Sequence, residues 1–161
     1  MARDEIPVTP AVRVLRAEKV AFEPHLYPYE EKGGTASSSK ALGVPEHSVV
    51  KTLVMEDDTK SPLIVLMHGD KQVSTKNLAR HLGARSITPC SPETATKHSG
   101  YLVGGTSPFG TKRAMPVYME STIAELPRIY LNGGKRGFLV SLAPSELMRV
   151  LKPALVSVAT E

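Results

Sequence analysis

The most informative stretch of this 161-residue chain covers residues 48–67 and reads SVVKTLVMEDDTKSPLIVLM. Two segments rich in β-branched and aliphatic residues, 48–55 and 62–67, flank the polar run EDDTK at 56–60. Two apolar runs joined by a short polar turn are typical of a β-hairpin. The sequence therefore predicts two neighbouring antiparallel strands in the middle of the chain.

Signals for helix starts and stops divide the rest of the chain into short alternating elements. Ser, Thr and Pro mark helix starts and Gly marks helix ends, which predicts helices over about 9–19, 35–42, 74–82, 91–99 and around 147–151. Further strands are predicted at 21–27, 115–119, 128–132 and 137–142, and an edge strand at 156–159. No linker separates these elements, so we expect one mixed α/β domain over residues 1–161.

Composition excludes several classes of protein. The 20 Lys and Arg outnumber the 16 Asp and Glu to give a net charge of +4, which permits a nucleic-acid partner without requiring one. No apolar run reaches the length of a membrane-spanning helix, and the first ten residues lack a signal-peptide core, so we expect a cytoplasmic protein that does not enter a membrane. The single cysteine, Cys90, excludes an internal disulfide and is expected to be a small buried residue.

Metal and nucleophilic chemistry have little support in the sequence pattern. The five histidines, at 25, 47, 68, 81 and 98, show no metal-ligand spacing, and no Gly-x-Ser-x-Gly motif marks a nucleophile. The sequence therefore predicts no metal site and no cofactor.

Three glycine pairs are the unusual feature: Gly33-Gly34, Gly104-Gly105 and Gly133-Gly134. Adjacent glycines can form a tight turn, or they can aim successive N–H groups at an anion or a developing oxyanion. The pair at 104–105 lies between apolar flanks and is followed by Thr106 and Ser107, which resembles a pocket lining. The pair at 133–134 precedes Lys135 and Arg136, which would be solvated tip charges if the segment is only a turn.

Lys51 is the second unusual feature, because it interrupts the apolar run VVKTLV at 49–54. In an alternating strand, Val49, Lys51 and Leu53 share one face. A charge at this position lies either at a sheet edge or in a cleft, where its ammonium would attract a phosphate or steady a developing negative charge.

Four stretches together resemble the YbaK family, the free-standing relatives of the editing domain inserted in bacterial prolyl-tRNA synthetase. They are TPAV at 9–12, VKTL at 50–53, GYLVGGTSPFG at 100–110 and YLNGGKRG at 130–137. They occur in the family's order and extend over nearly the whole chain. The resemblance implies a mixed α/β fold around a partly open, barrel-like sheet with flanking helices.

The resemblance also implies an activity and a set of site residues. The activity is deacylation of a mischarged tRNA, most plausibly Cys-tRNA(Pro), with the tRNA acceptor end as partner and prolyl-tRNA synthetase as a second candidate partner. In this family, activity depends most on a lysine matched by Lys51, and Thr52 follows it. Gly104 is the second expected catalytic residue, because the N–H groups of residues 104–107 would polarise the ester carbonyl. The other matched site residues bind the substrate: Tyr27 at the pocket rim, Gly105, Thr106, Ser107 and Pro108 with Gly104 in the pocket lining, and Gly133 and Gly134 facing the same cleft.

Two departures leave the identity of the amino acid open. The Cys-tRNA(Pro) deacylase branch often carries Asn-Phe where this chain has Gly33-Gly34, and tends to carry Asp where this chain has Leu139. Cys, Ala, Ser and Thr therefore all stay candidates, as do attack by water and attack by the substrate's own thiol. The alternatives from other classes are a non-catalytic module that binds tRNA ends or a synthetase, and a hydrolase of free esters or thiolactones.

Overall fold

The computed structural model of the protein describes residues 6–160. Its helices are α1 (Pro10–Ala17), α2 (Gly34–Leu42), α3 (Thr75–Leu82), α4 (Pro92–Ser99) and α5 (Pro144–Leu151), with 3-10 turns η2 (Glu46–Ser48) and η3 (Ser121–Glu125). Its strands are β1 (Glu23–Leu26), β2 (Val50–Asp57), β3 (Pro62–His68), β4 (Gln72–Val73), β5 (Ile87–Pro89), β6 (Val117–Glu120), β7 (Ile129–Lys135), β8 (Phe138–Leu142), β9 (Ala154–Val156) and β10 (Ala159–Thr160).

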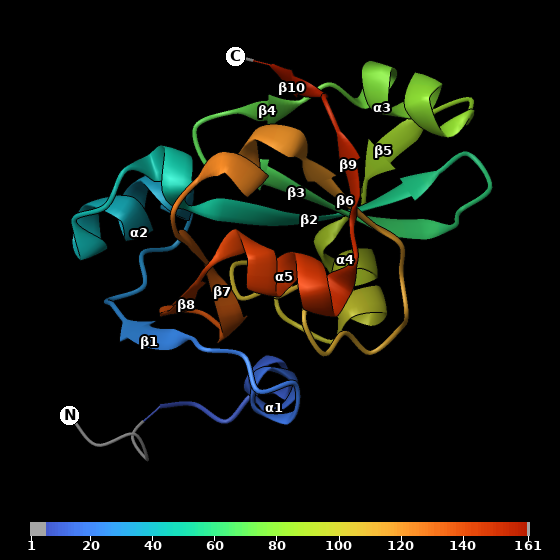
Figure 1. The fold of residues 1–161 in the computed structure, drawn as a ribbon. Helices are drawn as coiled ribbons and strands as arrows, with labels where there is room; N and C mark the ends of the chain where they lie inside the picture. Colours follow the sequence, from blue (N-terminus) through green and yellow to red (C-terminus); the bar gives the residue numbers. More distant parts are fainter. Residues whose placement is uncertain (1–5, 161) are drawn as a thin grey trace.

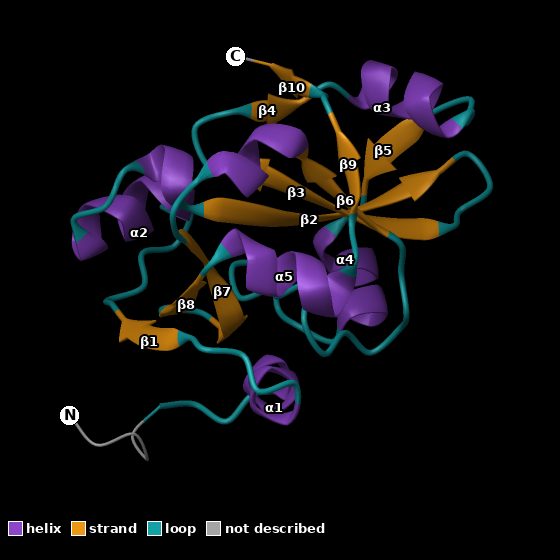
Figure 2. Ribbon diagram, viewed as in Figure 1, coloured by secondary structure: helices purple, strands orange, loops and turns teal. Residues whose placement is uncertain are grey.

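The strands form a five-stranded mixed sheet in the order β5-β2-β3-β6-β9, a three-stranded sheet in the order β1-β8-β7, and the pair β10-β4 (Figures 1 and 2). The predicted hairpin is confirmed, because β2 and β3 pair antiparallel from Val50↔His68 to Glu56↔Pro62. A parallel bridge between Val49 and Tyr130 links β2 to the smaller sheet. The sheets do not close into a barrel, so the predicted partly open mixed α/β fold is also confirmed.

The central strand β3 is buried at every position because elements cover both of its faces. Ile64 and Leu66 pack into a core that also contains residues of α1, β7 and β8. Val65 and Met67 point the other way, into a second core that contains Leu78 of α3. This division follows from the two-residue period of a strand. The same division applies to β2, because paired residues of neighbouring strands point to the same face. Each residue of β2 therefore faces the same core as its partner on β3.

The residues that predicted the helix starts and ends act as helix caps in the structure. The side chains of Thr9, Ser74 and Ser91 accept hydrogen bonds from the N–H groups three residues later. The glycines that follow α2, α3 and α4 all adopt positive φ angles, which a Cβ would disfavour; they are Gly43, Gly83 and Gly100. Among residues 6–160, no helix is long and apolar enough to cross a bilayer.

Three local predictions are wrong. The predicted strand at 156–159 is two strands in different sheets, because the Glu120 carboxylate accepts hydrogen bonds from the N–H groups of Val158 and Ala159 and separates β9 from β10. Gly133 and Gly134 lie inside β7, where an irregularity interrupts the pairing with β8, so the turn itself is at 136–137. Cys90 is half-buried rather than buried, because it directly follows the edge strand β5.

The buried position of β3 predicts a large cost for truncating its side chains. Leu66 is 0% exposed, and Leu66→Ala should lower the free energy of unfolding by about 2–5 kcal/mol through lost burial and a residual cavity. Leu155, which is 43% exposed on β9, offers the matched control, and Leu155→Ala should cost about 0.5 kcal/mol or less. Urea unfolding of both variants measures the difference, and equal costs would contradict the assignment of this core.

Candidate functional site

The loop around Gly104 packs directly against the hairpin formed by β7 and β8. The Asn132 amide nitrogen donates a hydrogen bond to the Gly104 carbonyl at 3.0 Å, and the Arg136 Nε donates one to the Val103 carbonyl at 2.9 Å. Asn132 also accepts, through Oδ1, from the N–H groups of Gly134 and Lys135. One side chain thus joins the two glycine-rich segments that the sequence singled out.

Close approach explains why both residues of the 104–105 pair are glycine. Gly104 has a φ of +96°, and a Cβ there would lie 2.6 Å from the Tyr29 hydroxyl. A Cβ on Gly105 would lie 2.9 Å from the backbone nitrogen of Arg136. The structure therefore needs glycine at both positions for packing, whatever else the loop does.

The hydrogen bonds within the loop limit which groups could meet a ligand. The Gly105 N–H donates to the Leu102 carbonyl at 2.8 Å, and the Ser107 hydroxyl, which is fully buried, accepts from the Phe109 N–H. Among residues 6–160, the N–H groups of Gly104, Thr106 and Ser107 have no acceptor in the protein. These three N–H groups, rather than the whole segment, are the donors that the loop could offer. Pro108, also expected in the pocket lining, is buried.

The second pair, Gly133-Gly134, packs against the start of α1 and against Phe138. The Thr9 hydroxyl donates to the Gly133 carbonyl at 2.5 Å, and a Cβ on Gly134 would lie 2.9 Å from both Thr9 and Tyr101. A Cβ on Gly133 would overlap the Phe138 ring. Tight packing therefore accounts for this pair as well, and places it beside the Gly104 loop through Asn132.

Arg136 is exposed at the turn between β7 and β8, as the tip-charge interpretation expects, but its side chain also contacts the Gly104 loop. Its guanidinium lies 5.3 Å from the centre of the Tyr29 ring, and its Nε holds the Val103 carbonyl. Tyr29, Asn132 and Arg136 were not among the predicted site residues. The only signal in the sequence was their closeness to Tyr27 and to the GGKRG stretch. Tyr27 itself is half-buried and donates its N–H to the Gly137 carbonyl at 3.0 Å, and burial raises the pKa of its phenol.

Lys51 is half-buried, and its ammonium donates a hydrogen bond to the Lys71 carbonyl at 2.5 Å. Burial lowers the pKa of Lys51 below 10.5, while the carboxylates of Glu46 and Asp70 oppose that shift. Strand β5 pairs only with positions 55–57 of β2, so β2 has no β5 partner at Lys51. The ammonium is thus partly enclosed, on a part of β2 that β5 does not reach and that lies next to the bridge to β7.

The bridge between Val49 and Tyr130 relates Lys51 to the Gly104 loop. The bridge is parallel, so Lys51 and Asn132 each lie two residues beyond it in the same direction along β2 and β7. Side chains two residues apart share a face of a strand. The side chains of Lys51 and Asn132 therefore lie on the same side of the junction between the two sheets. The Asn132 amide donates its hydrogen bond to the Gly104 carbonyl.

Thr52 points to the opposite face of β2 from Lys51, with Val50 and Val54. Its hydroxyl oxygen is buried and has no hydrogen-bond partner among residues 6–160. Buried hydroxyls are rarely left unsatisfied, so a ligand or water is its expected partner.

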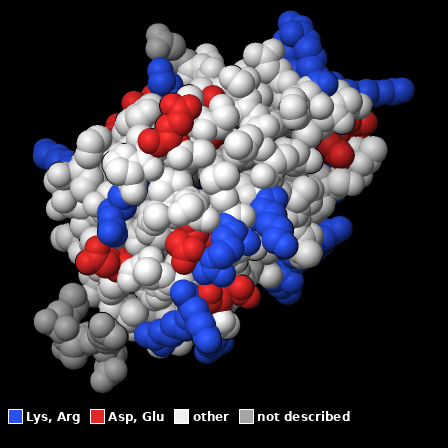
Figure 3. Space-filling model, viewed as in Figure 1, with Lys and Arg blue, Asp and Glu red and all other residues white. Residues whose placement is uncertain are grey.

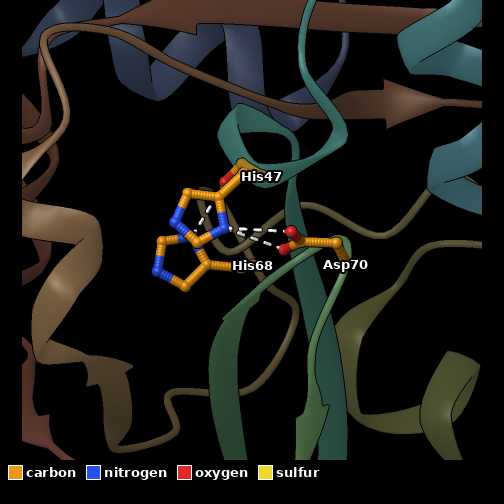
Figure 4. A group of neighbouring side chains, drawn as sticks. All are labelled: His47, His68 and Asp70. Carbon is orange, nitrogen blue, oxygen red and sulfur yellow. Dashed lines mark hydrogen bonds and ion pairs between the residues drawn. The ribbon is translucent and has the colours of Figure 1, made fainter. Parts of the chain in front are cut away.

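A stacked pair of histidines, His47 and His68, lies next to Asp70 (Figure 4). The rings of His47 and His68 are parallel within 7° and 3.7 Å apart, and His47 Nδ1 bonds the Asp70 carboxylate at 2.9 Å. Burial is the largest single influence on the pKa of Asp70 and raises it, but the hydrogen bond from His47, the charges of His47 and His68 and a backbone hydrogen bond together lower it below its usual value, which favours the ionised carboxylate. One ligand atom from each of His47, His68 and Asp70 lies within 4.8 Å of the other two, but both ring nitrogens of His68 already have hydrogen-bond partners, the His47 carbonyl and the Thr122 hydroxyl.

Cys90 is not placed to act as a nucleophile. Burial, with a smaller contribution from Glu56, raises the pKa of its thiol to about 11. The thiol is therefore protonated at neutral pH, and the thiolate that would attack a substrate is scarce.

Comparison with known proteins identifies the family. A model of the aminoacyl-tRNA editing domain matches residues 30–150. The chain belongs to the aminoacyl-tRNA editing domain family. This confirms the resemblance based on the four sequence stretches, and the matched range contains Lys51, the Gly104 loop and the β7–β8 hairpin.

Individual relatives of this editing-domain protein agree with that assignment. It is 25% identical to the "Putative Cys-tRNA(Pro)/Cys-tRNA(Cys) deacylase EbsC" of Enterococcus faecalis over 95% of this chain and 94% of the relative. It is 29% identical to a proline–tRNA ligase of Thermodesulfovibrio yellowstonii over 70% of this chain but 18% of the ligase.

Two solved structures share the fold. The crystal structure of hypothetical protein APE2540 matches with a TM-score of 0.86 at 20% identity, covering 94% of this chain and 99% of that one. The structure of "a putative trans-editing enzyme for prolyl tRNA synthetase" matches with a TM-score of 0.82 at 18% identity, covering 96% of this chain and 100% of that one. At these identities, the likeness concerns the fold alone.

The lowered pKa of Lys51 predicts a pH dependence of stability. Between the native pKa and the ordinary value of 10.5, the unfolded chain binds more protons than the native state, so stability contributed by this group rises with pH. Lys51→Met removes the group, so its stability advantage relative to wild type should shrink as pH rises toward 10.5. Urea unfolding at a series of pH values tests this, and a difference that stays constant with pH would contradict the burial of the ammonium.

Proposed function

We propose that this editing-domain protein is a trans-editing deacylase that removes a small, wrongly attached amino acid from tRNA, with Cys-tRNA(Pro) as its first candidate substrate. The observation that carries the proposal is the position of Lys51, a half-buried ammonium on the same side of the sheet junction as Asn132. The family match and the name of the Enterococcus faecalis relative support it. Its partner would be the tRNA acceptor end, with prolyl-tRNA synthetase as a second candidate, and its place of action would be the cytoplasm.

In this proposal, Lys51 holds the terminal adenosine or its phosphate, and the Gly104 loop polarises the ester carbonyl. The free N–H groups of Gly104, Thr106 and Ser107 are the donors available for the developing oxyanion, since Gly105 donates within the loop. One well-placed donor contributes about 3–4 kcal/mol to transition-state stabilisation. An aminoacyl ester is already activated, so positioning and charge stabilisation supply much of the acceleration.

Two routes complete the reaction. In the first, water adds to the carbonyl carbon, the ester C–O bond breaks, and the ribose oxygen takes a proton. In the second, the thiol of a cysteinyl substrate attacks its own carbonyl, the new S–C bond closes a thiolactone, and the thiol proton passes to the ribose oxygen. Both routes release the same free tRNA and differ in the amino-acid product.

Leu139 stands where the Cys-tRNA(Pro) deacylase branch tends to carry Asp. It is the register partner of Asn132 on the adjacent strand, so the two share a face, and it is buried. This position therefore offers no charged contact to a substrate, and Cys, Ala, Ser and Thr all stay candidates. A difference of one methyl group changes selectivity by only about 10–200-fold, so a panel of charged tRNAs is needed to rank them.

The tRNA body has a limited electrostatic target on the face drawn in Figure 3. Lysine and arginine side chains on that face lie among acidic ones rather than in a continuous basic stripe. Recognition concentrated on the acceptor end is consistent with this pattern, because nonspecific binding of a duplex needs several phosphate contacts.

One observation favours a second candidate, a module that binds tRNA ends without cleaving them. Packing alone explains the glycines at 104, 105, 133 and 134, and the Gly105 N–H is already used within the loop. Such a module would protect the aminoacyl ester, whereas a deacylase releases the amino acid. Turnover of charged tRNA separates the two.

Removal of the Lys51 ammonium should abolish most of the activity. We expect Lys51→Ala to slow deacylation of Cys-tRNA(Pro) by about 10²–10³-fold, the usual effect of deleting one electrostatic contact to a transition state. Release of labelled amino acid from Cys-, Ala-, Ser- and Thr-charged tRNA measures it.

Lys97→Ala, which alters an exposed lysine of α4, serves as the control and should retain the wild-type rate. A folded Lys51→Ala variant that deacylates at the wild-type rate would remove Lys51 from the mechanism. A wild-type protein that slows ester loss on every charged tRNA would support the binding module instead.

Gly104 provides a separate test of the loop. Gly104→Ala should displace Tyr29 or the loop and reduce deacylation by about 10–10²-fold, since small misplacements of reacting groups carry such penalties. Gly43→Ala is the matched control, because it has a similar positive φ of +68° but open space around the new Cβ. The control should lose stability with little loss of rate. Equal rates for the two folded variants would exclude the loop from the site.

A further inference from the structure

A second group of metal-ligating side chains lies away from Lys51. Glu56 lies near the end of β2, Cys90 directly follows β5, and His98 lies in the last turn of α4. One ligand atom from each residue lies within 4.8 Å of the other two. The three come from three different elements, so the fold rather than a sequence motif brings them together.

Specific backbone and side-chain contacts hold this group in place. The Cys90 N–H donates to the Val54 carbonyl at 3.1 Å, which extends the pairing of β5 with β2 by one residue. His98 is 6% exposed, and its Nε2 lies 2.9 Å from the Glu56 carboxylate. The ligand atoms of His98 and Glu56 therefore lie close together before any ion arrives.

We propose that Glu56, Cys90 and His98 form a binding site for Zn²⁺. A thiolate, an imidazole and a carboxylate are the donor types that zinc binds, usually in tetrahedral geometry. Glu56 and Cys90 are only half-buried, so a water molecule can occupy the fourth position. The trio of His47, His68 and Asp70 is the weaker candidate, because both ring nitrogens of His68 are already hydrogen-bonded within the protein and the trio offers no thiolate.

Binding requires three local changes, and it replaces the hydrogen bond between His98 Nε2 and Glu56 with bonds from both side chains to the ion. The Cys90 thiol releases its proton to solvent, and His98 turns its unprotonated Nε2 toward the ion, with its proton on Nδ1. The Arg113 guanidinium, 3.4 Å from that Nδ1, then has to move away. Arg113 is exposed, so its side chain can swing into solvent.

A bound ion would cross-link α4 and the segment after β5 to the end of β2. Glu56 lies five residues from Lys51 along β2, about 17 Å at 3.3 Å per residue. The zinc site is therefore independent of the proposed editing reaction, and the failure of either proposal leaves the other untouched.

Titration of the full-length metal-free protein with Co²⁺ gives a direct readout. A cobalt–thiolate charge-transfer absorption in the near ultraviolet, with intense visible bands typical of tetrahedral coordination, should saturate at one equivalent. Zn²⁺ should then displace the cobalt and abolish both signals. Competition with a chromophoric chelator measures the zinc affinity, and thermal unfolding should shift to higher temperature with added Zn²⁺.

Cys90→Ser should eliminate the charge-transfer absorption, and Cys90→Ser and Glu56→Gln should each weaken zinc binding at least tenfold. His81→Gln, at an exposed histidine of α3, is the matched control for His98→Gln and should bind as wild type does. If His98→Gln fails to fold, the Cys90 and Glu56 variants still decide the result. Absence of the thiolate band in wild type, or equal zinc affinity in wild type and Cys90→Ser, would overturn the proposal and leave the group as a Glu–His ion pair.

Discussion

The antiparallel pairing of β2 with β3 determines where the other parts of the molecule lie. Because β3 is buried on both faces, one core forms against α1, β7 and β8 and the other against α3. Strand β2 inherits the same division through its register with β3. Lys51 and Thr52 consequently point to opposite faces, and only Lys51 shares its side of the strand with Val49, the residue that bridges to Tyr130.

The contact between the glycine-rich loop and the β7–β8 hairpin is the second constraint on the candidate site. It depends on backbone atoms approaching more closely than a Cβ would allow, and on one amide side chain, that of Asn132. Glycine at these positions is therefore a packing requirement first, and a catalytic use of the loop has to be compatible with it. The N–H group of Gly105 donates a hydrogen bond within the loop, so only the unpaired N–H groups of the loop are available to bind a substrate.

Local features of the structure could be predicted from the sequence because their causes are local. The Ser and Thr caps, the glycine stops and the hairpin at 48–67 each follow from interactions among residues close in the chain. The break between β9 and β10 could not be predicted, because it depends on a carboxylate from Glu120, far earlier in the chain. The contacts of Arg136 could not be predicted for the same reason, since its partners Tyr29 and Val103 approach it only in the folded protein.

The candidate site shows the same limit. Lys51 and the loop could be singled out because a lysine in an apolar strand and a glycine pair between apolar flanks are visible in the sequence. Asn132, which joins the loop to the hairpin, has no comparable signal, and Glu56, Cys90 and His98 lack a regular spacing. In each case the missing information is the tertiary arrangement of strands.

The proposed activity requires that the Lys51 ammonium and the Gly104 loop bind the same aminoacyl end of a tRNA. Mapping where an analogue of that end binds tests this requirement most directly. The probe is a nonhydrolysable amide analogue of 3′-cysteinyl adenosine, titrated into isotope-labelled protein and followed by NMR chemical shifts. The account predicts that the Lys51 side chain and the N–H groups of Gly104 and Thr106 shift together, with a single saturation curve. Shifts confined to other parts of the molecule, or shifts of the loop without Lys51, would contradict it.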